Sequence, residues 1–294
     1  MKPAGIWVQA NAKINLTLDV LEERRDGYHN IRSVMQSISL HDRLSLTRTE
    51  CDISIEGSHR EVPWDADNLA CRAALELQKT VGTRQGVHIK LWKGIPVAAG
   101  LGGGSADAAA VLRGLNRLWD TKLDGDQMRE IGKRIGADVP FCLTGGTALA
   151  EGMGDILTPL EPVPMLWLVL FKPFFGVSTG EVYRAHRRIK DEYRYNTEDV
   201  LSELKKGALD GIISGIGNTL QRTTTSLYPE VADIIHGLEE IGIPKVFMCG
   251  SGPTVCAVVS DKKEARQLKG KCSGFNGNIY IAHTVPRAGV FLER

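Results

Sequence analysis

The sequence predicts a mixed α+β protein built from two domains. The chain has 294 residues, and about 150 residues is a typical domain size. Segments with the two-residue repeat of strands and segments with the 3.6-residue repeat of helices occur in both halves, without a regular β-α-β alternation. We therefore expect one domain over residues 1–157 and a second over residues 164–294. The boundary between them is marked by a cluster of prolines: Pro159, Pro162 and Pro164.

The composition is typical of a globular protein, with 43% hydrophobic and 24% charged residues. Lys and Arg total 36 and Asp and Glu 35, whereas proteins that bind nucleic acids or anionic membranes usually carry a basic excess. The longest apolar run, Met165–Phe171, is far shorter than the roughly 18 residues that span a bilayer. Polar residues between Gln9 and Asn15 interrupt any signal-peptide core. We expect a cytoplasmic protein that binds neither nucleic acid nor membrane.

The first elements are β-strands. Between Ile14 and Val20, apolar residues alternate with polar ones, which predicts a strand with one buried face. Asp26-Gly27 provides turn chemistry, and residues 31–40 and 43–47 are expected to form returning strands.

The next segments alternate between helix and strand. Helical spacing predicts a helix over residues 66–79, and a β-rich run predicts a strand over 87–92. From Ser105 to about Trp119, apolar residues recur at the spacing of an amphipathic helix. A further helix is expected over residues 126–135, ended by Gly136.

The second half follows the same mixed pattern. A buried strand is expected over residues 166–171. The remaining elements are helices near 179–190, 196–205 and 229–241, strands over 246–249 and 255–259, a charged helix near 262–270, and a last strand near 278–284.

A glycine-rich loop, Gly100–Ser105, lies between the strand over 87–92 and the helix that follows it. Glycines let successive backbone N–H groups converge on an anion, and a helix N-terminus adds partial positive charge, so the junction is suited to phosphate. A tight connection with Ser105 as N-cap is the alternative, but it would require one glycine rather than four. The loop has no Walker A lysine, and Asp120 does not end a second strand as a dinucleotide fingerprint requires.

This loop resembles the nucleotide loop of the GHMP kinase superfamily, the small-molecule kinases of galactose, homoserine and mevalonate type. The triple glycine and the Asp107-Ala108-Ala109 that follows Ala106 resemble one branch in particular, the 4-diphosphocytidyl-2-C-methyl-D-erythritol kinases. Mevalonate and homoserine kinases typically have serines at the positions of Gly103 and Gly104. The resemblance implies that the following residues bind ATP phosphates: Pro96, Val97, Ala98, Ala99, Gly100, Leu101, Gly102, Gly103, Gly104, Ser105 and Ala106.

Two further segments resemble the catalytic motifs of that branch. Residues 12–16 contain Lys13, which would assist phosphoryl transfer, and Asn15, which would bind substrate; the pattern alone favours a solvated strand lysine. The branch usually has proline at the position of Asn11. Residues 136–141 contain Asp138, which would act as general base, an effect worth about 10²–10⁴-fold in rate. The alternative for Asp138 is a side chain that caps the turn before Pro140.

The remaining matches concern the substrate. Asp26-Gly27-Tyr28-His29 resembles a cytidine-reading loop, in which Tyr28 would stack on the base and His29 would bond its edge; an incidental aromatic beside a turn is the alternative. Tyr183 falls where the branch places a second aromatic facing the first, and it is equally well a core residue of its helix. Residues 249–254 resemble the third motif of the superfamily; a plain glycine hairpin between two strands is the alternative. The resemblance implies that backbone N–H groups of Gly250, Ser251 and Gly252 would be available to the substrate diphosphate.

Other site residues have weaker signals. Asn68 opens a helix, where it would cap the N-terminus or reach the adenine as its counterpart does in the family. Asp107 would serve the nucleotide or favour the helix N-terminus. The cysteines and histidines show no metal-ligand spacing, so the Mg²⁺ ligands stay unassigned, with the Ser105 hydroxyl as a candidate.

The matches extend from residue 11 to residue 254 and imply a two-domain GHMP kinase fold, with a ribosomal S5 domain 2-like N-terminal domain and a ferredoxin-like α/β-sandwich C-terminal domain. They imply ATP and Mg²⁺ as cofactors and a small-molecule partner bearing a cytidine diphosphate group. The implied reaction phosphorylates the 2-hydroxyl of 4-diphosphocytidyl-2-C-methyl-D-erythritol in the non-mevalonate route to isopentenyl diphosphate and terpenoids. A monomer or weak homodimer is expected.

Two other functions stay open at this point. One is a sibling kinase that acts on homoserine or mevalonate. The other is a non-catalytic sensor of nucleotides or phosphometabolites, which would need neither Lys13 nor Asp138. RNA binding is disfavoured by the net charge of +1.

Overall fold

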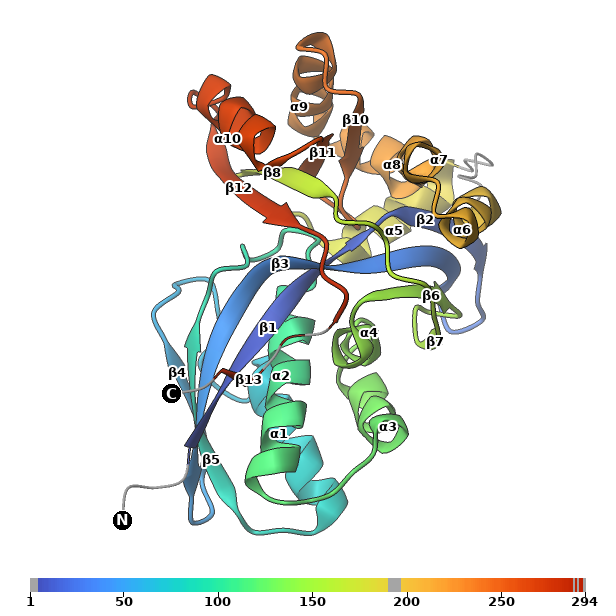
Figure 1. Cartoon of the computed structure of the whole chain (residues 1–294). Helices are drawn as coiled ribbons and strands as arrows, with labels where there is room; N and C mark the ends of the chain where they lie inside the picture. Colours follow the sequence, from blue (N-terminus) through green and yellow to red (C-terminus); the bar gives the residue numbers. More distant parts are fainter. Residues whose placement is uncertain (1–4, 190–196, 288, 290, 293–294) are drawn as a thin grey trace.

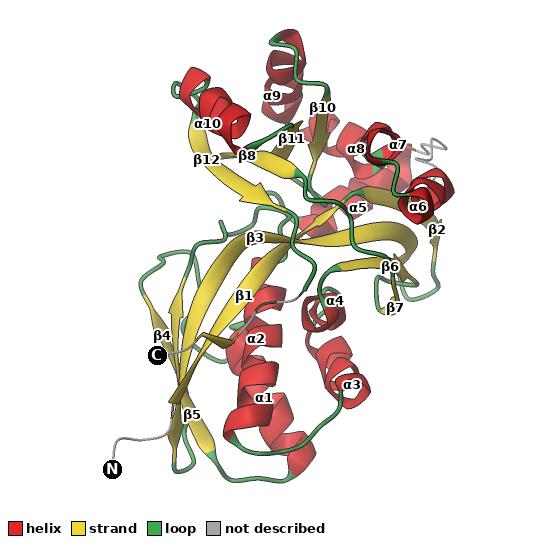
Figure 2. Ribbon diagram, in the orientation of Figure 1, coloured by secondary structure: helices red, strands yellow, loops and turns green. Residues whose placement is uncertain are grey.

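The computed structural model describes residues 5–189, 197–287, 289 and 291–292. Within these residues the chain forms two β-sheets with helices packed on each, as Figures 1 and 2 show. The larger sheet occupies one end of the molecule and the smaller sheet the other. The predicted α+β class is therefore confirmed.

The larger sheet has nine described strands, and its central path runs β13-β1-β3-β2-β9. All its pairings are antiparallel except β2 with β9 and β4 with β5. Its strands are β1 (Gly5–Asn15), β2 (Thr17–Glu23), β3 (His29–Thr49), β4 (Ile53–Gly57), β5 (Gly86–Trp92), β6 (Thr147–Glu151), β7 (Ile156–Pro159), β9 (Gly217–Asn218) and β13 (Phe291–Leu292). Four helices lie along one face of this sheet (Figure 2): α1 (Leu69–Val81), α2 (Gly103–Leu118), α3 (Gly125–Ile135) and α4 (Val139–Thr144).

The smaller sheet has the order β10-β11-β8-β12 and is antiparallel throughout. Its strands are β8 (Trp167–Pro173), β10 (Lys245–Met248), β11 (Val255–Val259) and β12 (Gly277–His283). The helices of this half are α5 (Thr179–Ile189), α6 (Thr197–Lys206), α7 (Leu209–Gly215), α8 (Leu220–Leu227), α9 (Pro229–Glu240) and α10 (Lys262–Lys271).

Two hydrophobic clusters form the core, and each contains residues from both sheets. The first packs α1 and α2 against β1, β3 and β5, and includes the fully buried Ile14, Leu46 and Leu112. The second lies around the smaller sheet and includes Phe171 and Leu238. Strands β9 and β13 come from the second half of the chain but pair with β2 and β1. The division at residues 157–164 stays a prediction.

The helices and strands differ from the predicted ones in instructive places. The two returning strands are one continuous strand, β3, because β1 pairs with it across the predicted break, with Ala10 opposite Asp42 and Asn11 opposite His41. The strand predicted between Ile14 and Val20 is divided at Leu16. Its polar side chains are buried as well, with Asn15 3% and Asp19 4% exposed. The prediction of a single buried face was wrong, since the chain covers both sides of this segment.

Several short helices and strands were not predicted from the sequence. Strands β4, β6, β7, β9 and β13 and helices α4, α7 and α8 were not predicted, because few-residue segments carry too little periodicity. The predicted helix limits at residues 190 and 196 lie outside the described residues.

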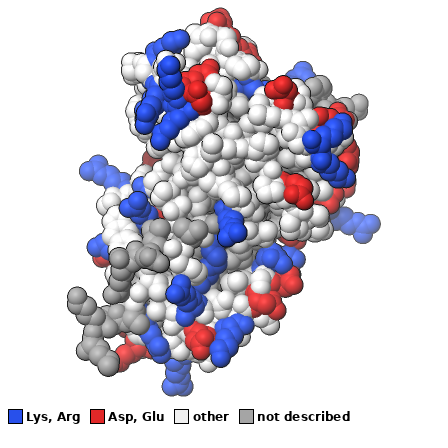
Figure 3. Space-filling view, in the orientation of Figure 1, with Lys and Arg blue, Asp and Glu red and all other residues white. Residues whose placement is uncertain are grey.

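The surface charge is mixed. Figure 3 shows basic and acidic side chains interspersed over the visible face, with some Lys and Arg gathered at the end of the molecule that carries α10. None of the described helices has both the length and the apolar character needed to cross a bilayer.

Candidate active site

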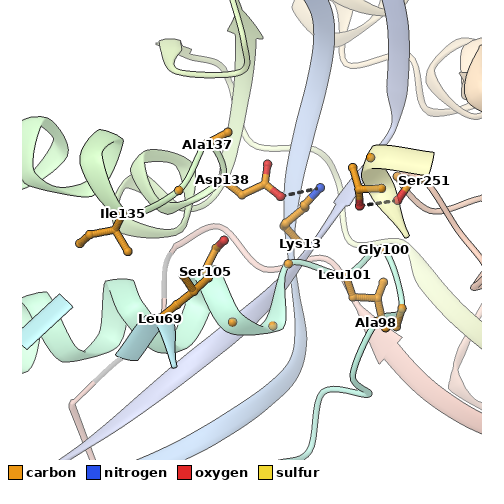
Figure 4. A pocket seen from close by; sticks show the side chains of 18 of the residues that line it. Lys13, Leu69, Ala98, Gly100, Leu101, Ser105, Ile135, Ala137, Asp138 and Ser251 are labelled. Carbon is orange, nitrogen blue, oxygen red and sulfur yellow. Dashed lines mark hydrogen bonds and ion pairs between the residues drawn. The ribbon is translucent and has the colours of Figure 1, made fainter. Parts of the chain in front are cut away.

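A cavity of about 1060 Å³ brings together segments from both halves of the chain. Its wall contains Lys13, Asp138, the glycine loop, the Tyr28-His29 turn and the beginning of α5. Figure 4 shows Lys13 and Asp138 pointing toward each other between the turn after α3 and the loop before α2. Of the residues proposed from sequence, Ala106 and Gly252 do not line the cavity; Ala106 is 1% exposed inside α2.

Lys13 is held by an irregularity in β1. The register of β1 with β3 shifts between Asn11 and Lys13, and the backbone N–H of Lys13 donates to the Leu101 carbonyl at 3.0 Å. Such bulges often redirect a side chain beside an active site. The Lys13 side chain is buried, with 6% exposure of the residue, so the solvated-lysine alternative was wrong.

The Lys13 ammonium has two polar neighbours. Its Nζ lies 3.2 Å from Asp138 Oδ2 and donates to Asn15 Oδ1 at 3.1 Å. Asn15 in turn donates to the Ser33 hydroxyl at 2.7 Å, which fixes the amide in place. The lysine is therefore positioned by two side chains and a backbone bond at the wall of the cavity.

Asp138 lies at the N-terminus of α4 but makes no capping hydrogen bond there. Pro140, in the first turn of that helix, needs no N–H partner, which reduces the need for a cap. The carboxylate is 35% exposed and turned toward Lys13. The capping alternative was wrong, and the side chain is available to a substrate hydroxyl.

The glycine loop ends in a left-handed residue. Gly102, at φ 69°, precedes the first residue of α2, so the helix begins at Gly103, two residues earlier than predicted, and Ser105 is not the N-cap. A Cβ on Gly102 would lie 2.8 Å from Cγ of Lys13. The loop backbone thus passes directly over the lysine side chain, and the N-terminus of a 16-residue helix points its free N–H groups into the cavity.

The glycine loop also packs against the loop over residues 249–254. A Cβ on Gly100 would lie 2.2 Å from the Cys249 carbonyl oxygen, and one on Gly250 would lie 2.9 Å from the Gly100 carbonyl oxygen. The two loops therefore approach backbone to backbone. The loop over residues 249–254 also contacts α5: the Ser251 hydroxyl lies 2.9 Å from the hydroxyl of Thr179, the first residue of that helix.

Replacing Gly100 with alanine should raise the KM for ATP about tenfold or more. The residue has φ 76° and its new Cβ would collide with a backbone carbonyl, and strain of this kind costs about 1–3 kcal/mol. Steady-state kinetics with varied ATP would measure the change.

The matched control is Gly237→Ala in α9, where an added Cβ meets nothing within 4 Å. That variant should keep the wild-type KM. An unchanged KM in Gly100→Ala would show that the contact between the two loops does not shape the phosphate site.

The Tyr28-His29 turn also lines the cavity. Tyr28 is 64% exposed, as a stacking platform would be, whereas His29 is 7% exposed and its Nδ1 has no hydrogen-bond partner among the described residues. Burial, and then the charge of Arg187, lower the pKa of His29, which favours the neutral ring at pH 7. The recorded ring contact of Tyr183 is with His29, with centroids 5.6 Å apart; Tyr183 also packs against the second cluster.

Asn68 caps α1. Its Oδ1 accepts from the Ala70 N–H at 2.9 Å and its Nδ2 donates to the Pro63 carbonyl at 2.8 Å. The residue also lines the cavity. A contact with adenine stays a prediction.

Sequence analysis missed a buried charge cluster below the loop. Lys93 Nζ donates to Asp42 and, at 2.8 Å, to Asp107 Oδ2. Asp42 also accepts the N–H groups of Gly94 at 2.6 Å and Ile95 at 2.8 Å. Burial raises the pKa of the Asp107 carboxyl, and Lys93 only partly offsets this effect. Asp107 is thus paired with Lys93, and nothing in the local sequence around Lys93 predicts this pairing.

The described residues include no group of three or more His, Cys, Asp or Glu that could hold a metal ion. Mg²⁺ usually keeps waters and binds through one or two protein oxygens and the substrate phosphates. Ser105 and Asp138 line the cavity beside the loop and carry suitable oxygens.

Comparisons with known proteins agree with this arrangement. The GHMP kinases N terminal domain matches residues 68–146, and the GHMP kinases C terminal domain matches residues 200–277. A 4-diphosphocytidyl-2-C-methyl-D-erythritol kinase of Pelotomaculum thermopropionicum is 46% identical over 95% of this chain and 98% of its own length. One from Shouchella clausii is 41% identical over 96% of this chain and 95% of its own.

Solved structures extend the comparison. A crystal structure of 4-(cytidine 5'-diphospho)-2C-methyl-D-erythritol kinase has a TM-score of 0.82 at 33% identity, covering 95% of this chain and 99% of that one. A homoserine kinase from Cytophaga hutchinsonii shares the fold, with a TM-score of 0.77 at 18% identity, covering 98% of this chain and 97% of that one.

The two-sheet fold and the loop above the Lys13–Asp138 pair define a GHMP kinase, a class of small-molecule kinases that use ATP. Within that class, the chain belongs to the family of 4-diphosphocytidyl-2-C-methyl-D-erythritol kinases.

Proposed function

We propose that this protein transfers the γ-phosphoryl group of ATP to the 2-hydroxyl of 4-diphosphocytidyl-2-C-methyl-D-erythritol, giving the 2-phosphate and ADP. The reaction would serve the non-mevalonate route to isopentenyl diphosphate and terpenoids. The observation that carries the proposal is the Lys13–Asp138 pair, 3.2 Å apart, on the wall of a cavity that also contains the glycine loop and the Tyr28-His29 turn.

The chemistry follows from the positions of these groups. The glycine loop and the N-terminus of α2 would hold the ATP phosphates through backbone N–H groups. Asp138 would accept the proton of the substrate hydroxyl while the oxygen of that hydroxyl bonds to the γ-phosphorus. At the same time, the bond between the γ-phosphorus and the β-γ bridging oxygen breaks, and ADP leaves. Lys13 would offset the negative charge on the transferring group. Phosphoryl transfer depends mainly on such positioning and electrostatics.

Mg²⁺, when bound with the nucleotide, would neutralise charge on the β- and γ-phosphates. The Ser105 hydroxyl, in the first turn of α2, would hold it together with those phosphates.

The substrate end of the cavity would read cytidine. Tyr28 would stack on the base through its exposed ring, and the neutral His29 would bond the base edge through Nδ1, which no described residue hydrogen-bonds. Tyr183, whose ring lies against that of His29, would help to hold the imidazole in place. Asn15, bonded to Lys13, would face the methylerythritol hydroxyls.

An ATP-consumption assay with a substrate panel tests the proposal. We expect turnover with the cytidyl diphosphate substrate and none with homoserine or mevalonate, with the product identified by mass spectrometry as a monophosphorylated derivative. Turnover of homoserine or mevalonate, with the cytidyl substrate ignored, would assign the chain to a sibling kinase. Tight ATP binding with no turnover of any substrate would favour a sensor.

A further inference from the structure

The charges that line the cavity are almost all compensated. Six Lys and Arg side chains line it within the described residues. Five form ion pairs with carboxylates: Lys13 with Asp138, Lys93 with Asp42 and Asp107, Lys133 with Glu130, Arg134 with Glu76, and Arg187 with Glu23. The sixth, Arg184, is exposed and has no hydrogen bond or ion pair with any described residue.

The position of Arg184 follows from helix α5. Thr179, Gly180, Tyr183, Arg184 and Arg187 line the cavity, at the spacing of one helical face. The opposite face is anchored in the protein interior, where Val182 is fully buried and His186 contacts the Thr223 hydroxyl at 2.9 Å. The backbone that carries Arg184 is therefore fixed relative to the cavity.

Helix α5 contacts both the Tyr28-His29 turn and the loop over residues 249–254. Tyr183 contacts His29 at the cytidine end. Tyr183 and Asp138 line the same cavity, so this part of α5 also faces the space that contains the catalytic carboxylate. Thr179, at the start of the helix, contacts Ser251. A group that joins a bound cytidine to a reacting alcohol must pass this stretch of α5.

We propose that Arg184 binds the diphosphate of the substrate and gives the enzyme its preference for a cytidine diphosphate over a cytidine monophosphate. This inference rests on the proposed function. The diphosphate diester carries two negative charges, and Arg184 is the described cation of the cavity wall whose charge no carboxylate already balances. A guanidinium can donate two parallel N–H bonds to phosphate oxygens.

The test compares wild type with Arg184→Gln, Arg184→Lys and the control Arg266→Gln. Arg266 is exposed on α10 and does not line the cavity, so its replacement removes the same charge at a distance. Steady-state kinetics would give the KM for the cytidyl substrate and for ATP. Competition would give the inhibition constants of CDP and CMP, two probes that differ by one phosphate.

For Arg184→Gln we expect the KM for the cytidyl substrate to rise about 10- to 100-fold, since hydrogen bonds to charged groups are worth about 1.5–3 kcal/mol. The KM for ATP should stay within about twofold of wild type. The preference for CDP over CMP should largely disappear. In Arg184→Lys, the KM for the cytidyl substrate should lie between those of wild type and Arg184→Gln, because lysine keeps the charge without the paired N–H geometry. Arg266→Gln should behave as wild type.

Three results would overturn the assignment. An unchanged ratio of CDP to CMP affinity in Arg184→Gln would show that Arg184 does not contact the diphosphate, while leaving the proposed function intact. A rise in the KM for ATP with no rise for the cytidyl substrate would place Arg184 at the nucleotide instead. A wild-type protein that neither binds CDP nor uses the cytidyl substrate would reject the proposed function and the inference together.

Discussion

Replacing Asp138 with asparagine should lower kcat by about 10²–10⁴-fold, the range that general-base catalysis typically contributes. The amide is nearly the same size as the carboxylate but does not accept a proton from the substrate hydroxyl. Asp138 caps no helix and has Lys13 as its recorded ion-pair partner, so the replacement should leave the fold and the binding of ATP intact. Single-turnover kinetics at saturating ATP and substrate would measure the loss directly.

The control is Asp233→Asn, which makes the same chemical change on the exposed face of α9, away from the cavity. It should keep the wild-type kcat. An Asp138→Asn variant with wild-type kcat would contradict the proposed base, whereas a raised KM for ATP at constant kcat would indicate a binding role. Combining Asp138→Asn with Lys13→Ala should cost less than the product of the two single losses, because paired residues act as a unit.

Replacing Lys93 with methionine should lower the free energy of unfolding by about 3–5 kcal/mol, the usual effect of removing one partner from a buried ion pair. Its side chain is 7% exposed, and the variant would leave two buried carboxylates, Asp42 and Asp107, facing each other without a cation. Urea denaturation monitored by circular dichroism would measure the shift in midpoint.

The loss of stability in Lys93→Met should become smaller as the pH falls. Burial already raises the pKa of Asp107, and loss of Lys93 should raise it further. A carboxyl whose pKa is higher in the folded state than in the unfolded state makes the folded state bind more protons, so stability increases as the pH falls. The stability difference between the variant and wild type should therefore narrow from pH 8 toward pH 5.

Lys122→Met provides the control, because the pair of Lys122 with Asp120 is exposed, with side-chain exposures of 79% and 81%. Exposed pairs contribute about 0–1 kcal/mol. Adding Asp107→Asn to Lys93→Met should recover part of the lost stability by removing one buried charge. Equal losses in the Lys93 and Lys122 variants would show that the buried cluster does not stabilise the fold below the loop.

The long, periodic elements were predictable because their signals are local. The helices over residues 126–135 and 262–270 and the strands over 87–92 and 255–259 were found within a few residues of their observed limits. The glycine loop was predictable for the same reason, since closely spaced glycines before an apolar helix already indicate a backbone that approaches a ligand. The length of β3 was not predictable, because pairing with several neighbouring strands keeps it extended through His41-Asp42.

The site was only partly predictable. Lys13 and Asp138 were identified through the family resemblance, whereas the alternating pattern around Lys13 favoured a solvated side chain. The pattern was misleading because the bulge near Asn11 and the loop above it bury the polar face. Lys93 and Arg184 carry no distinctive local signal, and their importance depends on which carboxylates lie nearby and which do not.

The amino-acid order by itself determined the α+β class, the glycine-rich junction between a strand and a helix, and the family, because periodicity, glycine content and motif order are properties of neighbouring residues. Only the tertiary structure decided that an ammonium on β1 and a carboxylate before α4 lie 3.2 Å apart, and which cations in the cavity are already paired. Electrostatic energies depend on distance and burial, and for residues far apart in the chain both quantities are set by folding.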